Sequence, residues 1–262
     1  MGLCTLAQAK GIKIISITDH DSVEGVKDVK KDPHNKSVGI IPGIEISTIC
    51  NHKYLHILGY FVDFENEDLS DYIKFVSNEK TENTRLNFEN ALYLGIFSYP
   101  WERVLEINKD QPRISGVHVV KAMEYDHFSI GGMGLWDMFH KYFWAESPDF
   151  LETETMTGYD AIDIILKANG VPVIAHPKSV DNDDTIRDLI NHGVKGLEVY
   201  HPIHSKSEIE KYMQMSIDNR LLITGGSDWH GRNSGADAMP IGTIGLENDK
   251  YEILHMYKDK YL

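Results

Sequence analysis

Residues 12–21 have the sequence IKIISITDHD, a β-branched run that ends in residue types able to bind a metal ion. Such a run predicts a buried strand, and its end delivers Asp19, His20 and Asp21. The same form recurs further along the chain. The other runs are 38–44 before Glu45, 54–55 before His56, 171–175 before His176, 196–199 around Glu198 and before His201, and 221–223 before Asp228-Trp229-His230.

Parallel strands in a barrel place all their carboxyl ends on one face, so these side chains are expected to converge in a single pocket. A cluster of His, Asp and Glu without Cys favours Zn, Mn, Fe or Mg, and shared carboxylates allow a site with several ions. The pattern therefore predicts a metal-dependent hydrolase of the α/β class.

Composition limits the alternatives. The chain has 262 residues, of which 42% are hydrophobic and 25% charged, enough for one barrel-sized domain with an insertion. The net charge of −14 argues against an extended nucleic-acid surface. Cys4 and Cys50 form neither a CxxC motif nor a paired framework, and no stretch resembles a signal peptide or a membrane span. These features predict a cytoplasmic protein without a membrane partner.

The hydrophobic period changes part-way along the chain and indicates two regions. The start, 1–11, is expected to be the end of a helix with Gly11 after it, and strands follow up to residue 62. Charged segments with helical period then replace them, and strand and helix alternate again from 159, with a last strand near 241–246. The predicted barrel domain is 1–62 with 158–262, and the predicted helical insertion subdomain is 63–157.

Six ordered motifs resemble the polymerase and histidinol phosphatase (PHP) superfamily, and within it the stand-alone TrpH-like phosphoesterases. The motifs are Ile17-Thr18-Asp19-His20-Asp21, Pro42-Gly43-Ile44-Glu45-Ile46-Ser47, His56-Ile57-Leu58-Gly59, Ala175-His176-Pro177, Gly196-Leu197-Glu198-Val199 and Gly226-Ser227-Asp228-Trp229-His230-Gly231. The resemblance implies a distorted seven-stranded (β/α) barrel with a helical insertion. It also implies up to three divalent ions and hydrolysis of phosphate esters by a metal-bound hydroxide.

One family feature has no counterpart here. The family pattern opens with a strand that bears His-x-His and a nearby Asp, and nothing before Gly11 supplies them. The expectation is that the first strand is missing, through a mis-assigned start or a genuine loss, and that fewer than three ions bind. Two strand edges would then be exposed, which predicts self-association.

The resemblance also implies roles for individual residues. The expected metal ligands are His20, Glu45, His56, His176, Asp228 and His230, with Glu45 bridging two ions. Asp19 is expected to orient an imidazole. Taken singly, a histidine such as His56 in an apolar strand is more often a satisfied core or cross-strand histidine, and Asp228 to His230 are also compatible with a solvated turn after Gly225-Gly226.

Three further residues are candidates for catalysis. A family segment similar to Arg113 and His118 lies over the metal site, so these residues are expected to bind the phosphate or protonate the leaving group. The alternative for both is a surface turn before a helix at 117–123. His201 is a candidate for substrate contact, and Glu198 for orienting a ligand. The aromatic residues Tyr93, Trp101, Trp136, Phe139, Phe143 and Trp144 either stack on a nucleobase or form the core of the insertion.

The predicted function is hydrolysis of small phosphate monoesters, such as nucleoside phosphates or 3′,5′-bisphosphonucleosides. An exonuclease acting on short oligonucleotides is an alternative with the same chemistry. A catalytically impaired module that binds metal or ligand is an alternative of a different class.

Overall fold

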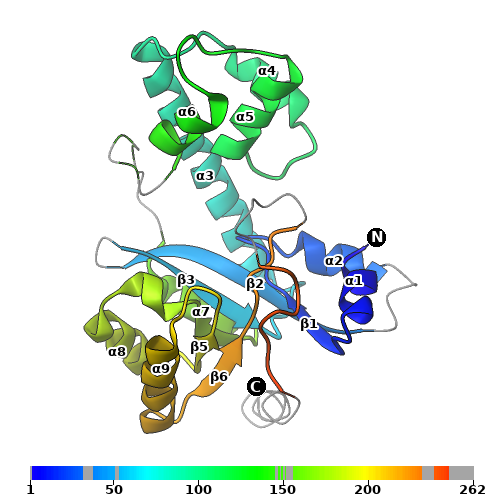
Figure 1. Ribbon diagram of the computed structural model, residues 1–262, viewed down its shortest axis with the longest axis vertical. Coiled ribbons are helices and arrows are strands. Elements are labelled where there is room, and N and C mark those ends of the chain that lie inside the picture. The colour runs from blue at the N-terminus through cyan, green and yellow to red at the C-terminus, as the bar shows by residue number, and fades with distance from the viewer. Residues whose placement is uncertain are drawn as a thin grey trace. The chain divides into compact units, whose positions relative to one another are not determined.

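The computed structural model describes residues 2–31, 38–50, 53–144, 147, 149, 151, 156–231 and 239–247. The chain divides into two compact units, Met1–Tyr72 with Met156–Leu262, and Ile73–Thr155 (Figure 1). The first cut falls inside a helix, at Tyr72, whereas the sequence analysis places the boundary after Val62.

The first unit is built on a six-stranded sheet with the order β1-β2-β3-β4-β5-β6. The strands are β1 (Ile14–Ile17), β2 (Gly39–Cys50), β3 (Lys53–Tyr60), β4 (Val171–Ile174), β5 (Gly196–Tyr200) and β6 (Leu222–Gly225). Among the described residues no strand pairs with the outer edge of β1 or of β6. The described sheet is therefore open, with six strands where the resemblance implies seven.

The expectation that all strands run parallel is wrong for β3. Strand β3 is antiparallel to both β2 and β4, while β1 is parallel to β2, β4 to β5 and β5 to β6. The reason is the short connection from Cys50 to Lys53, because a parallel crossover needs a dozen or more residues. The amino end of β3 thus lies beside the carboxyl end of β2, and His56 still reaches the expected edge.

Helices cover the sheet where the sequence predicts them. They are α1 (Leu3–Ala9), α2 (Glu24–Lys31), α7 (Gly158–Lys167), α8 (Asp183–His192) and α9 (Lys206–Asp218). The short 3₁₀ helix η1 (Pro177–Val180) was not predicted. Helix α7 packs on β2, β3 and β4, and α9 packs on β5 and β6. Gly11 follows α1 with φ +75°, the left-handed conformation that glycine adopts after a helix. None of the helices in the described residues combines the length and apolar character of a membrane span.

The predicted last strand at 241–246 is wrong. Residues 239–247 form turns and irregular backbone, and the Thr243 amide donates a 3.1 Å hydrogen bond to the Pro240 carbonyl. Gly242 has φ +78°, which a strand does not accommodate. Ile241 is buried against Ala7 and Val38, so the segment packs beside the start of β1.

The second unit is helical, as the sequence of the insertion predicts. Helix α3 (Glu67–Tyr93) enters it, and α4 (Trp101–Ile107), α5 (Gly116–Tyr125) and α6 (Leu135–Tyr142) complete it. Phe139 and Phe143 are buried in its core with Trp101 packed against them, which favours the core interpretation for these three. Tyr93, Trp136 and Trp144 are exposed.

Candidate metal centre

Glu45 is the centre of the predicted ligand set. It is buried on β2, and its Oε1 lies 2.7 Å from Nδ1 of His56 and 3.4 Å from Nε2 of His176. Its other oxygen, Oε2, lies 3.9 Å from Nε2 of His20. One carboxylate therefore contacts three imidazoles from three different segments of the chain.

Strand pairing explains why these side chains meet. Ser47 of β2 pairs with His56 of β3, and Glu45, two residues away, points to the same face of the sheet. On the other side, His20 forms a parallel bridge with Glu45 beyond the end of β1. Asp21 secures this bridge, because its carboxylate accepts hydrogen bonds of 3.0 Å from both the amide and the hydroxyl of Ser47.

His176 enters the centre from the loop after β4. Its φ is +26°, a left-handed value that is costly for a residue with a side chain and that marks a constrained position. Its backbone amide donates a 2.9 Å hydrogen bond to Oε2 of Glu198 on β5. Its Nδ1 lies 2.6 Å from Oγ of Ser179 in η1. Hydrogen bonds therefore hold both the backbone and the side chain of His176 in place.

Asp228 and His230 follow β6 and lie on the other side of His20. The His230 ring centroid is 5.7 Å from that of His20. Asp228 has φ +48°, and its carboxylate lies 3.6 Å from both Nδ1 of His230 and Nε2 of His201. The structure thus brings all six predicted ligands into one region at one edge of the sheet.

The donor set is suited to divalent cations. His20, Glu45 and His56 each offer a ligand atom, and these atoms lie within 4.8 Å of one another. Imidazole nitrogens beside a carboxylate suit Zn, Mn and Fe, and a carboxylate with three contacts of this kind can serve two ions. The residues present therefore fit a metal centre.

The charges of the centre support the same conclusion. Burial alone would raise the pKa of the Glu45 carboxyl, but hydrogen bonds from His176 and His56 hold that pKa well below its ordinary value. Burial alone would lower the pKa of His176. The hydrogen bond with the Glu45 carboxylate and the charge of that carboxylate together have the larger effect, so the pKa of His176 is raised. The negative Glu45 carboxylate therefore favours positive charge next to it. A bound cation can supply that charge in place of the protons on the histidines.

The other carboxyl groups near the centre, those of Glu198, Asp19 and Asp228, differ from one another in the direction of their pKa shifts. Burial raises the pKa of Glu198 to about 8. Burial also raises the pKa of Asp19, whose carboxylate accepts a hydrogen bond from the Gly25 amide. For Asp228, burial is opposed by a contact with His201, and its pKa is lowered. The lowered pKa keeps Asp228 in the carboxylate form, which is the form that binds a cation.

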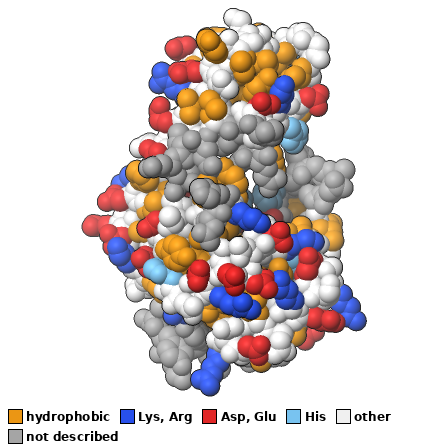
Figure 2. Space-filling view, turned by 90° about the vertical axis from the view of Figure 1, so that its left-hand side faces the viewer, with side chains coloured by type: hydrophobic (Ala, Val, Ile, Leu, Met, Phe, Trp, Pro, Cys, Tyr) orange, Lys and Arg blue, Asp and Glu red, His pale blue; other side chains and the backbone are white. Residues whose placement is uncertain are grey.

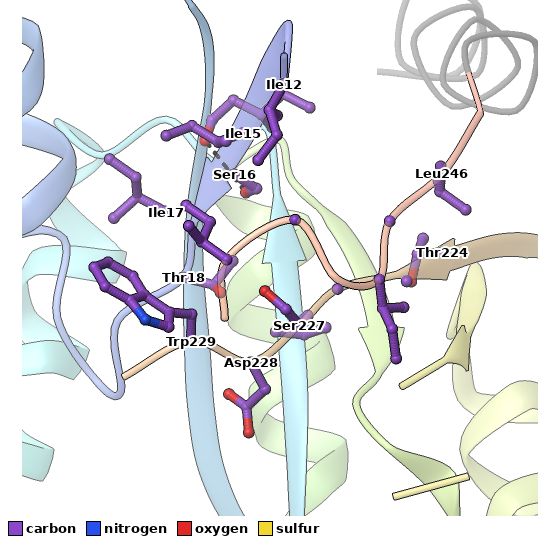
Figure 3. A pocket seen from close by; sticks show the side chains of 18 of the residues that line it. Ile12, Ile15, Ser16, Ile17, Thr18, Thr224, Ser227, Asp228, Trp229 and Leu246 are labelled. Atoms are coloured by element: carbon purple, nitrogen blue, oxygen red, sulfur yellow. Dashed lines mark hydrogen bonds between the residues drawn. The ribbon is translucent and has the colours of Figure 1, made fainter. Parts of the chain in front are cut away.

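A cavity of about 980 Å³ adjoins the centre. Its lining includes all the predicted ligands except His56, together with apolar side chains of β1, β3 and residues 239–247. Figure 3 shows Asp228 and Trp229 on the loop after β6, beside Ile17 and Thr18 at the end of β1. The edges of β1 and β6 thus form the walls of the space next to the ligands.

The three candidates for catalysis occupy different surroundings. His201 is 4% exposed, and its Nδ1 accepts a 3.3 Å hydrogen bond from the Ile203 amide, which leaves Nε2 to face Asp228. This burial favours support of Asp228 over contact with substrate. Arg113 and His118 belong to the other unit, just before and within α5.

His118 also has a local structural role. Its Nδ1 accepts a 3.0 Å hydrogen bond from the Ser115 amide, in a capping box at the start of α5. Nε2 therefore carries the proton of the neutral ring. Burial, and then the charges of Lys121 and Arg113, lower the His118 pKa. His118 is thus a neutral hydrogen-bond donor at pH 7, which suits phosphate binding better than protonation of a leaving group.

Two supporting residues were not identified from the sequence. Ser179 contacts His176, and Asp21 clamps Ser47. The spacing of Ser179, three residues after His176 and behind Pro177, is a signal that could have revealed the first, because a 3₁₀ turn brings positions i and i+3 together. The role of Asp21 depends on pairing between two distant strands, which the sequence does not display.

The chain is similar to several known enzymes. The chain is 23% identical over 86% of its length to a phosphoribosyl 1,2-cyclic phosphate 1,2-diphosphodiesterase of Eggerthella lenta, of which 86% is covered. It is 24% identical over 87% of its length to a 3′,5′-nucleoside bisphosphate phosphatase of Chromobacterium violaceum, with 81% of that protein covered. It is also 24% identical over 82% of its length to the 5′-3′ exoribonuclease Rnm of Salmonella typhimurium, with 74% covered.

These relatives are enzymes of phosphate esters. The resemblance to PHP-type phosphoesterases that the motifs predict is therefore confirmed. No family model matches the chain. In fold, the chain matches a protein of Bifidobacterium adolescentis provisionally described as a metal-dependent phosphoesterase, with a TM-score of 0.80 and 23% identity over 97% of this chain and 90% of that one.

Proposed function

We propose that this chain hydrolyses phosphate esters of small molecules with the help of divalent cations held at Glu45. The observation that carries the proposal is the convergence of His20, His56 and His176 on that one buried carboxylate. The relatives support it, because each acts on a phosphate ester or diester. Substrates of the proposed class are nucleoside phosphates and 3′,5′-bisphosphonucleosides.

The chain's own residues have distinct parts in this proposal. Glu45, His56 and His176 would hold one ion, and His20, Asp228 and His230 would complete the centre. Bound cations of the Mn, Zn, Fe or Mg type would neutralise charge on phosphoryl oxygens and lower the pKa of water. Glu45 stays ionised at neutral pH because of its two histidine contacts, so it can bind without first losing a proton.

The other unit is proposed to select the substrate. Arg113 offers a forked cationic group that suits phosphate oxygens, and neutral His118 offers an Nε2 proton. Arg113 precedes α5, and His118 lies in its first turn. We assign Arg113 and His118 to substrate binding, and we assign metal binding to residues of the first unit.

An exonuclease acting on short oligonucleotides is the second candidate. The Rnm relative supports it. The net charge of −14 argues against the binding of long nucleic acids, because their phosphates would be repelled. On the face drawn in Figure 2, acidic and basic side chains of the described residues are interspersed, a distribution that suits small substrates.

A test needs both metal content and turnover. The protein is treated with EDTA, reloaded with Mn²⁺, Zn²⁺ or Mg²⁺, and assayed for phosphate release from a 3′,5′-bisphosphonucleoside, a nucleoside monophosphate and a five-nucleotide RNA. We expect hydrolysis of the first two that depends on the added ion. Preference for the RNA would favour the exonuclease. Tight metal binding without any turnover would instead support the impaired binding module.

A further inference from the structure

Ser179 makes two contacts with His176, and they fix the position of its hydroxyl proton. Its Oγ lies 2.8 Å from the backbone carbonyl oxygen of His176 and 2.6 Å from Nδ1 of the same residue. A carbonyl can only accept, so the single hydroxyl proton goes to it. The oxygen is then an acceptor toward the ring, and Nδ1 must carry a proton.

We propose that Ser179 is a positioning residue that keeps the proton of His176 on Nδ1 and so leaves Nε2 as the atom that binds a cation. This inference rests on the proposed function, since it assigns His176 to the metal centre. The Nε2 atom is the one that faces the centre, 3.4 Å from Oε1 of Glu45 and 3.2 Å from Nδ1 of His56.

The surroundings of His176 make the ring orientation depend on this contact. The backbone is fixed by the amide hydrogen bond to Glu198 and by Pro177, which begins η1. That fixes the Cα but leaves rotation about the side-chain bonds. Within the described contacts, Oγ of Ser179 is the partner that Nδ1 has on the side away from the centre.

The opposite tautomer would be harmful to cation binding. Without an acceptor at Nδ1, a neutral His176 gains more by placing its proton on Nε2, where it can donate to Oε1 of Glu45, 3.4 Å away. A cation would then have to displace that proton. Partners that hold the far nitrogen of a metal-binding histidine are typically worth 10-fold to 100-fold in affinity or activity. Ser179 is exposed, so we expect the lower end, about 10-fold.

The experiment uses the full chain in four forms: wild type, Ser179→Ala, Ser179→Thr and Ser179→Asp. Threonine keeps the hydroxyl, and aspartate provides a stronger acceptor. Ser207→Ala is the matched control, because Ser207 is an exposed serine of α9 whose hydroxyl contacts Ser205 alone among the described contacts. The ¹⁵N chemical shifts of the imidazoles, recorded in metal-free protein at a pH high enough to keep the His176 ring neutral, report the tautomer, and calorimetry reports the Kd for Zn²⁺ and Mn²⁺.

We expect the Nδ1-protonated tautomer in wild type, Ser179→Thr, Ser179→Asp and the control. In Ser179→Ala we expect a shift toward Nε2 protonation and about 10-fold weaker cation binding. An unchanged tautomer in Ser179→Ala, or equal loss of affinity in all three Ser179 variants, would overturn the inference. If wild type binds neither ion, the proposed function fails, whereas the metal-free spectra still decide the tautomer.

Discussion

His56 Nδ1 lies 2.7 Å from Oε1 of Glu45, although 11 positions separate the two residues. The contact depends on the pairing of β2 with the antiparallel β3, which places His56 opposite Ser47, two residues from Glu45. His176, 3.4 Å from the same oxygen, comes from β4, the other neighbour of β3. The centre is therefore assembled around the one strand that runs against the rest.

Removal of the central carboxylate should abolish the activity without unfolding the protein. In Glu45→Ala, His20, His56 and His176 lose the negative charge that pairs with them, and a cation loses a ligand. We expect loss of bound Mn²⁺ and at least about 100-fold slower hydrolysis, with a largely unchanged Tm, since polar residues at strand ends contribute little to barrel stability.

Asp228→Ala should behave in the same way, because its carboxylate is ionised and lies beside His201 and His230. Glu24→Ala is the control, since Glu24 is an exposed acid paired with Lys27 at 2.7 Å. Metal content is measured by mass spectrometry and stability by thermal unfolding. Full activity in Glu45→Ala or Asp228→Ala would exclude the metal mechanism.

Arg113→Ala and His118→Ala should separate substrate binding from metal binding. Both residues are assigned to substrate oxygens, so we expect a KM increase of about 10-fold or more with unchanged metal content. His118→Gln is the matched variant, because its amide oxygen can replace Nδ1 as acceptor for the Ser115 amide. Metal loss in step with activity would show instead that these residues are ligands or supports of the centre.

The ligand positions could be predicted because their signal is local. His20 and His176 each follow an apolar run just beyond the end of a strand, and strand ends gather at one edge of a sheet. Glu45 also follows an apolar run, but β2 continues past it to Cys50. The sequence of residues 241–246, by contrast, has strand-like isoleucines, yet Pro240 and Gly242 set a turn there. Backbone conformation at those two positions outweighed the apolar pattern.

The direction of β3 could also have been predicted, because two residues between Cys50 and Lys53 are too few for a parallel crossover. Other features could not. The burial of His201 and its contact with Asp228 join two different loops, and the 3.6 Å distance depends on how β5 and β6 pack. Tertiary contacts of this kind have no period and no motif in the sequence.

The open edges of the sheet predict self-association. The backbone carbonyls of Lys13 and Asp19 accept hydrogen bonds from β2 amides. Because backbone groups alternate in direction along a strand, Ile14 and Ser16 direct theirs away from β2, toward the cavity. Unpaired edge groups recruit other strands. We expect the mass measured by light scattering to increase with protein concentration.

Ser16→Pro removes one outward amide and should reduce this association. Ser16→Ala is the matched control, because it also loses the 3.2 Å hydrogen bond from the Ser16 hydroxyl to the Ile41 carbonyl but keeps the amide. Equal association of the two variants would show that the edge of β1 takes no part.

Glu198→Gln should make the metal-free protein more stable at high pH. Burial raises the Glu198 pKa from 4.5 to about 8, so between these values the folded chain holds a proton that the unfolded chain has lost. The contribution of this group to stability therefore falls as pH rises from 4.5 to about 8. Glutamine keeps an oxygen for the His176 amide and never ionises.

In EDTA, the difference in Tm between Glu198→Gln and wild type should therefore increase as the pH rises from 4.5 to about 8, and then level off. The exposed control Glu24→Gln should show no such trend. Thermal unfolding followed by circular dichroism at intervals of one pH unit provides the measurement. A constant difference between Glu198→Gln and wild type from pH 4 to 9 would mean that Glu198 ionises normally, and that the charge balance inferred around His176 is incorrect.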